Sequence, residues 1–139
     1  NWLSEANLDK REAEWIGTPH PGEARKLLGE EIDDRFTAVE RLHDLYGGLW
    51  VLKGAGTLVG PNPIYVNPFA DSILATAGSG DVLAGVIGGL FSQKSASPAQ
   101  KGVYIHSKAA ELLKTEGRTT IVATDLLDAV SKVITAGNN

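Results

Sequence analysis

The chain has 139 residues, of which 42% are hydrophobic, and its formal net charge is −4 with no block of basic residues. This length predicts at most one globular domain, and the charge argues against binding to nucleic acid or to an anionic membrane surface. Because cysteine is absent from these residues, disulfides, thiolate metal ligands and a cysteine nucleophile are excluded.

The N-terminal residues 1–12 are polar and contain no apolar core of the kind that signal peptides carry. No window of the sequence approaches the length of apolar chain that spans a bilayer. A cytoplasmic location and no membrane partner are therefore expected. Since methionine is absent, even at position 1, we expect that a further segment precedes Asn1 in the natural protein.

The first half of the chain predicts two strands separated by two helices. An apolar run at residues 14–18 stops at Pro19, as a buried parallel strand does. Helices are expected over residues 21–29 and from Asp33-Asp34 to the glycines at 47–48. Apolar residues recur in the second helix and are expected to face a sheet: Phe36, Val39, Leu42 and Leu45.

A second strand is expected at residues 49–52, where the run is continuously apolar and therefore typical of a strand buried on both faces. Residues 58–60 and 64–66 predict a hairpin around a turn at 61–63. Trp15 and Trp50 fall on the predicted strands, where packing is favoured over stacking on an adenine ring.

The second half predicts three helices. The first follows the glycines at 78–80 and is expected to be buried, because residues 82–91 are almost entirely apolar. The second runs from Ala99 to about Thr115, and the third spans residues 126–136. Their inward faces are expected to consist of Val103, His106, Ala110 and Leu113 in the second helix and Leu127, Val130 and Ile134 in the third. These strands are too few for a finished open sheet, so the chain resembles half a domain.

The stretch Ala75–Asp81 indicates a site for an anion. Its glycines let the backbone turn tightly, and the following helix start offers unpaired N–H groups and a partial positive charge. Asp81 lies at that helix start, where a carboxylate can accept a proton from a hydroxyl that attacks a phosphoryl group. The structural alternative is that Asp81 is a helix-start acid and Ser79 an N-cap.

Three blocks of sequence stand out in this order: Thr18–Ala24, Val51–Thr57 and Ala75–Gly85. With Asn1-Trp2-Leu3 they cover nearly the whole chain, and together they closely resemble the NAD(P)H-hydrate dehydratases of the ribokinase-like superfamily. The resemblance implies an α/β fold, a three-layer α/β/α sandwich with a mostly parallel sheet. Residues 1–139 would form about the C-terminal half of this single nucleotide-binding domain, whose N-terminal half lies outside the chain.

Members of this family repair hydrated NADH and NADPH (NADHX and NADPHX) at the expense of ADP or ATP. The hydrate hydroxyl is phosphorylated, phosphate leaves, and the nicotinamide double bond returns. The resemblance thus implies a lyase that uses ADP or ATP and Mg²⁺, often as a tetramer. It leaves open which nucleotide is preferred and whether an epimerase domain is fused upstream.

The family motifs also imply roles for individual residues. Asp81 would be the catalytic base and a contact to the hydrate, and His20 a second substrate contact. Glu23 would orient metal-bound water. The nucleotide and its transferred phosphate would be bound by Lys53, Gly54, Ala55, Gly56 and Thr57 and by Gly78, Ser79 and Gly80.

Structural alternatives stay open for several of these residues. His20 is also typical of a turn residue that hydrogen-bonds locally, Glu23 of a helix-start acid, and residues 53–57 of a strand end with a turn. His43 and His106 match no family block, and a satisfied or surface histidine is expected at each.

Two other functions remain compatible with the sequence. The first is a small-molecule kinase of the same superfamily, because a Gly-x-Gly-Asp loop suits any transfer of phosphate to a hydroxyl. The second is a non-catalytic fragment that binds nucleotide without turnover.

Overall fold

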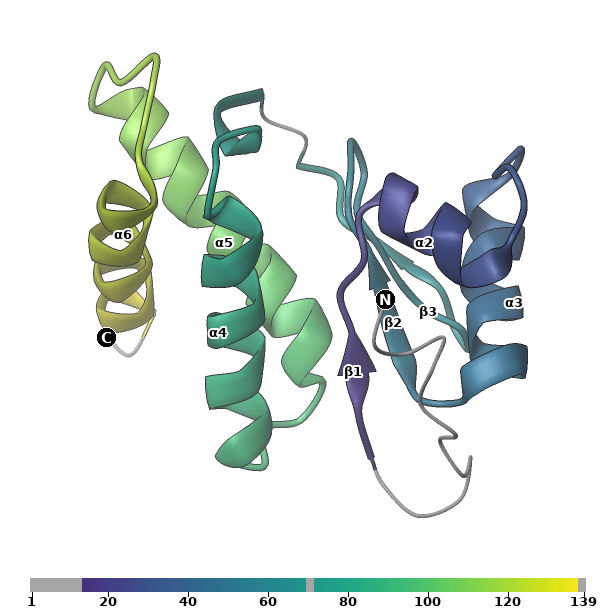
Figure 1. The fold of residues 1–139 in the computed structure, drawn as a ribbon. Helices are drawn as coiled ribbons and strands as arrows, with labels where there is room; N and C mark the ends of the chain where they lie inside the picture. Colours follow the sequence, from purple (N-terminus) through teal and green to yellow (C-terminus); the bar gives the residue numbers. More distant parts are fainter. Residues whose placement is uncertain (1–13, 70–71, 138–139) are drawn as a thin grey trace. The chain divides into compact units, whose positions relative to one another are not determined.

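The computed structural model describes residues 14–69 and 72–137, and the chain divides into two compact units, Asn1–Pro68 and Phe69–Asn139 (Figure 1). The lead-in at Asn1-Trp2-Leu3 lies outside the described residues. No helix in the described ranges is both long and apolar enough to cross a bilayer.

The first unit is built on a small mixed sheet. Its strands are β1 (Ile16–Gly17), β2 (Leu49–Leu52), β3 (Leu58–Gly60) and β4 (Tyr65–Val66), in that spatial order. β1 pairs parallel with β2, whereas β2 with β3 and β3 with β4 pair antiparallel. The predicted strands and hairpin are therefore confirmed, and the antiparallel hairpin makes the described part of the sheet mixed.

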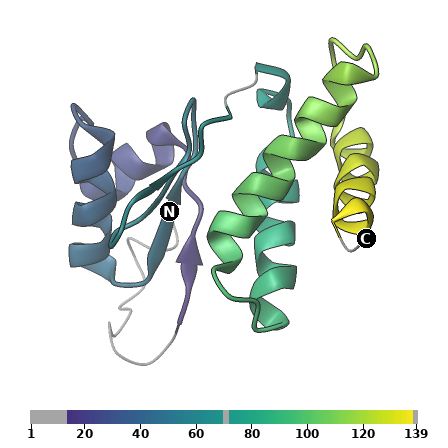
Figure 2. The ribbon, with the colours of Figure 1, turned by 180° about the vertical axis from the view of Figure 1, so that it is seen from behind.

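Two helices, α2 (Pro21–Leu28) and α3 (Arg35–Tyr46), pack on the same face of this sheet (Figures 1 and 2). Gly29 ends α2 in the left-handed conformation at φ 73°, and the Asp34 carboxylate caps α3 by accepting from the N–H groups of Phe36 and Thr37. The predicted boundaries are thus confirmed, because capping residues are local signals.

The buried face of α3 differs from the predicted one. Val39 and Leu42 are fully buried together with Ala38, whereas the side chains of Phe36 and Leu45 are exposed. Residues three apart are offset by about 60° around a helix with 3.6 residues per turn, so Phe36 and Leu45 lie on opposite sides. Residues that recur at every third position therefore do not stay on one face of a helix.

The core of the first unit is centred on Trp50, which is fully buried between α3 and the sheet. The Trp15 ring packs edge-on against it, with the ring centroids 4.9 Å apart. Trp50 also donates from Nε1 to the carbonyl of Gly47 at 2.9 Å. Both indole rings thus serve packing, as predicted.

The second unit contains the short 3₁₀ helix η1 (Ser72–Leu74) and three α-helices: α4 (Ser79–Ser92), α5 (Pro98–Thr115) and α6 (Ala123–Ala136). Helix α5 packs against both α4 and α6. Gly102 of α5 lies against Ile87 of α4, where a Cβ would be only 2.5 Å from the Ile87 Cγ1 atom. A glycine is therefore needed for this close approach of the two helices.

The predicted inward face of α5 is confirmed, since its four members are all buried. In α6, however, the exposed Leu127 and Ile134 were wrongly predicted to be buried, and Leu126, Ala129 and Val130 form the inward face. The helix begins at Ala123, three residues before the predicted start. Because the prediction made Leu126 the first residue of the helix, it did not count this residue on the inward face. Helix α4 is half buried rather than buried, because Ala84, Gly85, Gly88 and Gly89 are exposed.

Candidate functional site

The first candidate element is the N-terminus of α4. Gly78 is the N-cap residue, in the left-handed conformation at φ 82°, and no side chain caps the helix. The alternative that Ser79 is the N-cap is therefore wrong. Among the described residues, no acceptor binds the N–H groups of Gly80 and Asp81. These two amides and the helix dipole are the features that bind anions at helix N-termini.

The Asp81 side chain belongs to the first turn of α4 and is exposed. It lines an open pocket of about 530 Å³ in the second unit. The remaining lining is apolar or glycine: Gly78, Val82, Gly85, Val86, Ala123 and Leu127. An exposed carboxylate beside unpaired amides and an apolar wall can contact a polar reacting group and a flat apolar group at the same time.

Two side-chain contacts hold the glycine loop, residues 75–81, in place before α4. The His106 Nε2 atom lies 3.0 Å from the carbonyl oxygen of Ser79 and 3.2 Å from its buried Oγ. Because a carbonyl can only accept, Nε2 carries a proton and donates it there. Thr76 donates from Oγ1 to the carbonyl of Ile121 at 2.9 Å. The glycine loop is therefore bound to both α5 and the segment before α6.

Both unassigned histidines are satisfied, as predicted: His106 by Ser79, and His43 by the carbonyl of Gly48, 2.6 Å from its Nδ1. The role of His106 in supporting the glycine loop was nevertheless missed. The two residues are 27 positions apart, and the only sequence signal was the place of His106 on the inward face of α5.

The second candidate element, residues 53–57, follows β2 in the first unit. Gly54 and Gly56 have positive φ angles of 137° and 65°. The Lys53 N–H donates to the carbonyl of Pro19 at 2.9 Å, and the Thr57 hydroxyl donates to the carbonyl of Gly54 at 3.1 Å. The segment is thus a structured loop with two glycine conformations that other residues rarely adopt.

His20 and Glu23 form a capping box at the start of α2. The Glu23 N–H donates to the His20 Nδ1 at 3.2 Å, and the His20 N–H donates to the Glu23 Oε2 at 2.7 Å. Both structural alternatives for these residues are therefore realised. Their side chains remain exposed by 57% and 52%, so a further contact to a ligand is sterically open.

The first unit brings three of the predicted site residues together. The Glu23 Oε2 atom lies 3.6 Å from the His20 Nε2 and 3.8 Å from the Lys53 Nζ. The Lys53 side chain is only 24% exposed, so its ammonium group is partly withdrawn from water beside this carboxylate. This cluster offers a cation and a carboxylate at the entrance of the loop 53–57.

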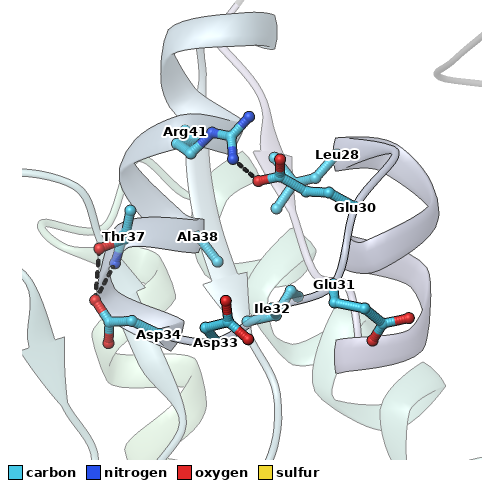
Figure 3. A pocket seen from close by; sticks show the side chains of 9 residues that line it. All are labelled: Leu28, Glu30, Glu31, Ile32, Asp33, Asp34, Thr37, Ala38 and Arg41. Carbon is cyan, nitrogen blue, oxygen red and sulfur yellow. Dashed lines mark hydrogen bonds and ion pairs between the residues drawn. The ribbon is translucent and has the colours of Figure 1, made fainter.

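A separate acidic pocket of about 170 Å³ lies between α2 and α3 (Figure 3). Four carboxylates line it: Glu30, Glu31, Asp33 and Asp34. Glu30 pairs with Arg41 and Asp34 caps α3, so these side chains serve structure. Across residues 14–69 and 72–137, no three His, Cys, Asp or Glu side chains are grouped so that they could bind a metal ion.

Sequence reasoning also missed Arg35, whose guanidinium donates to the carbonyls of Leu52, Lys53 and Ala55. The arginine lies about twenty positions before the loop that it contacts, and no local pattern connects the two.

Comparison with known proteins gives a consistent result. The family model of NAD(P)H-hydrate dehydratase matches residues 1–132. The bifunctional NAD(P)H-hydrate repair enzyme Nnr of Coxiella burnetii is 46% identical over 135 residues, which cover 91% of this chain and 27% of that protein. The ADP-dependent (S)-NAD(P)H-hydrate dehydratase of Neisseria meningitidis is 44% identical over 107 residues, covering 71% of this chain and 36% of that protein.

Solved structures agree with these relatives. The ADP/ATP-dependent NAD(P)H-hydrate dehydratase of Bacillus subtilis, co-crystallised with ATP/Mg²⁺, matches with a TM-score of 0.85 at 30% identity, covering 96% of this chain and 52% of that one. A ribokinase-like superfamily protein of Enterococcus faecalis matches with a TM-score of 0.80 at 26% identity, covering 96% and 49%. The predicted ribokinase-like α/β fold is confirmed. This chain spans about a quarter of its bifunctional relatives and half of the solved structures, and it belongs to the NAD(P)H-hydrate dehydratase family.

Proposed function

We propose that these residues form the C-terminal half of a ribokinase-like domain that dehydrates hydrated NADH and NADPH with ADP or ATP. The observation that carries the proposal is the N-terminus of α4. Asp81 is exposed there beside two amides that no acceptor binds in the described part of the chain. Membership in the family supports the choice of substrate.

The proposed reaction assigns one task to each part of the α4 N-terminus. The hydrate hydroxyl attacks the terminal phosphorus of the nucleotide, so one P–O bond forms while the bond to the leaving nucleotide breaks. Asp81 accepts the hydroxyl proton, and the amides of Gly80 and Asp81 stabilise the negative charge on the transferred phosphoryl group. The C–O bond to phosphate then breaks, the neighbouring ring carbon loses a proton to water, and the ring double bond is restored.

The first unit would bind the nucleotide phosphates and the substrate. The loop 53–57 presents backbone amides and the Lys53 ammonium group, and Thr57 retains acceptor capacity on its hydroxyl. His20 keeps Nε2 available to a substrate oxygen, because its Nδ1 accepts within the capping box.

Glu23 fits the proposed Mg²⁺ site through water, because Mg²⁺ is usually bound by one or two carboxylates together with substrate phosphates. The Glu23 carboxylate is half exposed, and its contact with Lys53 places it next to the loop 53–57. When bound, the ion would neutralise charge on the phosphates. ATP/Mg²⁺ was co-crystallised with the Bacillus subtilis relative.

Activity is expected to require the remaining half of the domain, and the isolated chain is expected to bind nucleotide at best. The test joins these 139 residues to the half of the Bacillus subtilis enzyme that they do not match. Hydrated NADH and ADP or ATP are added, and NADH absorbance is followed. Recovery of absorbance supports a dehydratase, phosphorylated hydrate without recovery supports a kinase, and binding without either supports a non-catalytic fragment.

In this joined protein, Asp81→Asn should lower kcat by about 10²- to 10⁴-fold, the usual contribution of a general base. Nucleotide affinity should change little, because the amides of α4 remain. Asp128→Asn is the matched control, since it removes the same charge from an exposed position on α6 of the same unit. Turnover by Asp81→Asn within tenfold of this control would contradict the assignment.

The remaining expectations stay predictions. A tetramer would be detected by light scattering of the joined protein, and a cytoplasmic location by fractionation of the source cells.

A further inference from the structure

The Arg35 guanidinium group is bound entirely by backbone carbonyls of the segment that carries the proposed phosphate loop. Nη1 donates to the Ala55 oxygen at 2.7 Å, and Nη2 donates to the oxygens of Leu52 and Lys53 at 3.1 and 3.4 Å. Among the described residues no carboxylate pairs with Arg35, so its charge is not neutralised locally. The side chain thus brings a positive charge against the back of the loop.

These carbonyl contacts determine where the loop's amides point. In a trans peptide unit the C=O and the following N–H point in opposite directions. The Lys53 and Ala55 carbonyls point toward the guanidinium, so the N–H groups of Gly54 and Gly56 point away from it. In the described part of the chain no acceptor binds either amide. Two outward amides separated by one residue can donate to the same anion.

Gly54 provides an independent observation. At its φ of 137°, a Cβ would lie 3.2 Å from the Arg35 Nη2 atom, which is tighter than ordinary contact. A side chain at this position would therefore require the guanidinium to move by a few tenths of an ångström. The positive φ of Gly54 and the position of Arg35 are thus compatible with each other only because residue 54 is a glycine in close contact with the guanidinium.

The position of Arg35 also carries costs to folding. Burial lowers the pKa of Arg35, because the charged guanidinium is partly removed from water. The Arg35 Nε atom is also buried and has no hydrogen-bond partner among the described residues, which is a cost to folding. A half-buried cation with an unsatisfied donor is the kind of local cost that binding sites retain.

We propose that Arg35 is a positioning residue for the nucleotide phosphates, which orients the amides of Gly54 and Gly56 toward them and adds positive potential from behind. This inference rests on the proposed nucleotide-binding role of residues 53–57. Arg35 itself would act through the backbone and not touch the phosphates. Its fork of donors suits the two ends of the loop, which the single ammonium group of a lysine cannot bridge.

The test measures binding of ADP and of inorganic pyrophosphate to the joined protein described above, by calorimetry and by amide NMR. In the unsubstituted joined protein, either ligand should shift the amide signals of Gly54 and Gly56 more than those of Gly29 or Gly117. Arg35→Ala and Arg35→Lys should each weaken ADP binding by about tenfold or more, the equivalent of one lost charged hydrogen bond. Both should abolish the selective shifts.

Tyr46→Phe is the matched control in the same unit. It removes one side-chain hydrogen bond to a backbone carbonyl, from the Tyr46 hydroxyl to Leu27 at 2.8 Å, without touching the loop. It should lower stability and leave ADP affinity unchanged. If Arg35→Ala does not fold, Arg35→Lys carries the test.

The outcomes separate this inference from the function on which it rests. If the unsubstituted joined protein binds ADP and Arg35→Lys binds it equally well, charge alone suffices and the orienting role is overturned. If ADP shifts amides elsewhere but not those of Gly54 and Gly56, the inference fails while nucleotide binding stands. If the unsubstituted joined protein binds neither ADP nor pyrophosphate, the proposed function of residues 53–57 fails and the inference with it.

Discussion

The same substitution, glycine to alanine, should have opposite effects on stability at the N-cap of α4 and in the interior of this helix. Gly78 has a φ of 82°, and a Cβ there would lie 3.0 Å from the Cβ of Ala123. Alanine in the left-handed conformation costs about 1–2 kcal/mol, and the close contact adds to this cost. Gly88 lies in the helix interior, where a Cβ would meet nothing within 4 Å. Alanine there should stabilise the helix by about 0.5–1 kcal/mol.

The expected difference in the free energy of unfolding between Gly78→Ala and Gly88→Ala is therefore roughly 2 kcal/mol, from the conformational costs of left-handed alanine and helical glycine. Urea unfolding of the 139-residue chain, followed by far-UV circular dichroism, measures both variants in one assay. A Gly78→Ala variant as stable as the unsubstituted chain would show that the loop does not need the left-handed conformation. A destabilised Gly88→Ala variant would show that this face of α4 is covered in solution.

Two further predictions concern the framework around the candidate site. Gly102→Ala should lower the free energy of unfolding by about 1–3 kcal/mol, as overpacking does, because its Cβ would lie 2.5 Å from Ile87; equal stability in urea would contradict the close approach of α4 and α5. Asp34→Asn should weaken the dependence of the free energy of unfolding on pH in the acidic range. Hydrogen bonds from the Thr37 hydroxyl, the Thr37 N–H and the Phe36 N–H lower the pKa of Asp34 below 3.8. The stabilisation from the charged cap is therefore present above pH 3.8 and lost as the pH falls through the lowered value. Unfolding measured between pH 2 and 6 checks this, and parallel profiles would refute it.

Helix and strand boundaries could be predicted because their signals are local. Asp34 before α3 and Gly29 after α2 have side-chain chemistry that caps a helix wherever they occur in a chain. The apolar run at residues 49–52 likewise predicted β2. The turns at the two glycine-rich segments, residues 53–57 and 75–81, could also be predicted from sequence. A positive φ is favoured by glycine itself and does not depend on distant contacts.

Burial was harder to predict because it depends on what a helix packs against. Leu127 and Ile134 are as apolar as Leu126, yet they are exposed while Leu126 is fully buried. Ala129 faces inward, where its small side chain brings α6 close to its neighbours, and an apolar pattern gives little weight to alanine. The antiparallel pairing of β3 with β4 followed from the local turn signal at residues 61–63, whereas the register of β1 against β2 depends on partners that no local window contains.

The two glycine-rich segments expose amides by different means, and this difference explains which supports the sequence could reveal. At the start of α4 the helix itself directs the N–H groups of Gly80 and Asp81 outward, so a helix signal is sufficient to predict an anion site. His106 reinforces that geometry through the Ser79 carbonyl. Residues 53–57 contain no helix, so their amides can be aligned only by contacts from elsewhere in the fold. Arg35 makes those contacts from α3, and for this reason a local motif could predict the loop but not the residue that orients it.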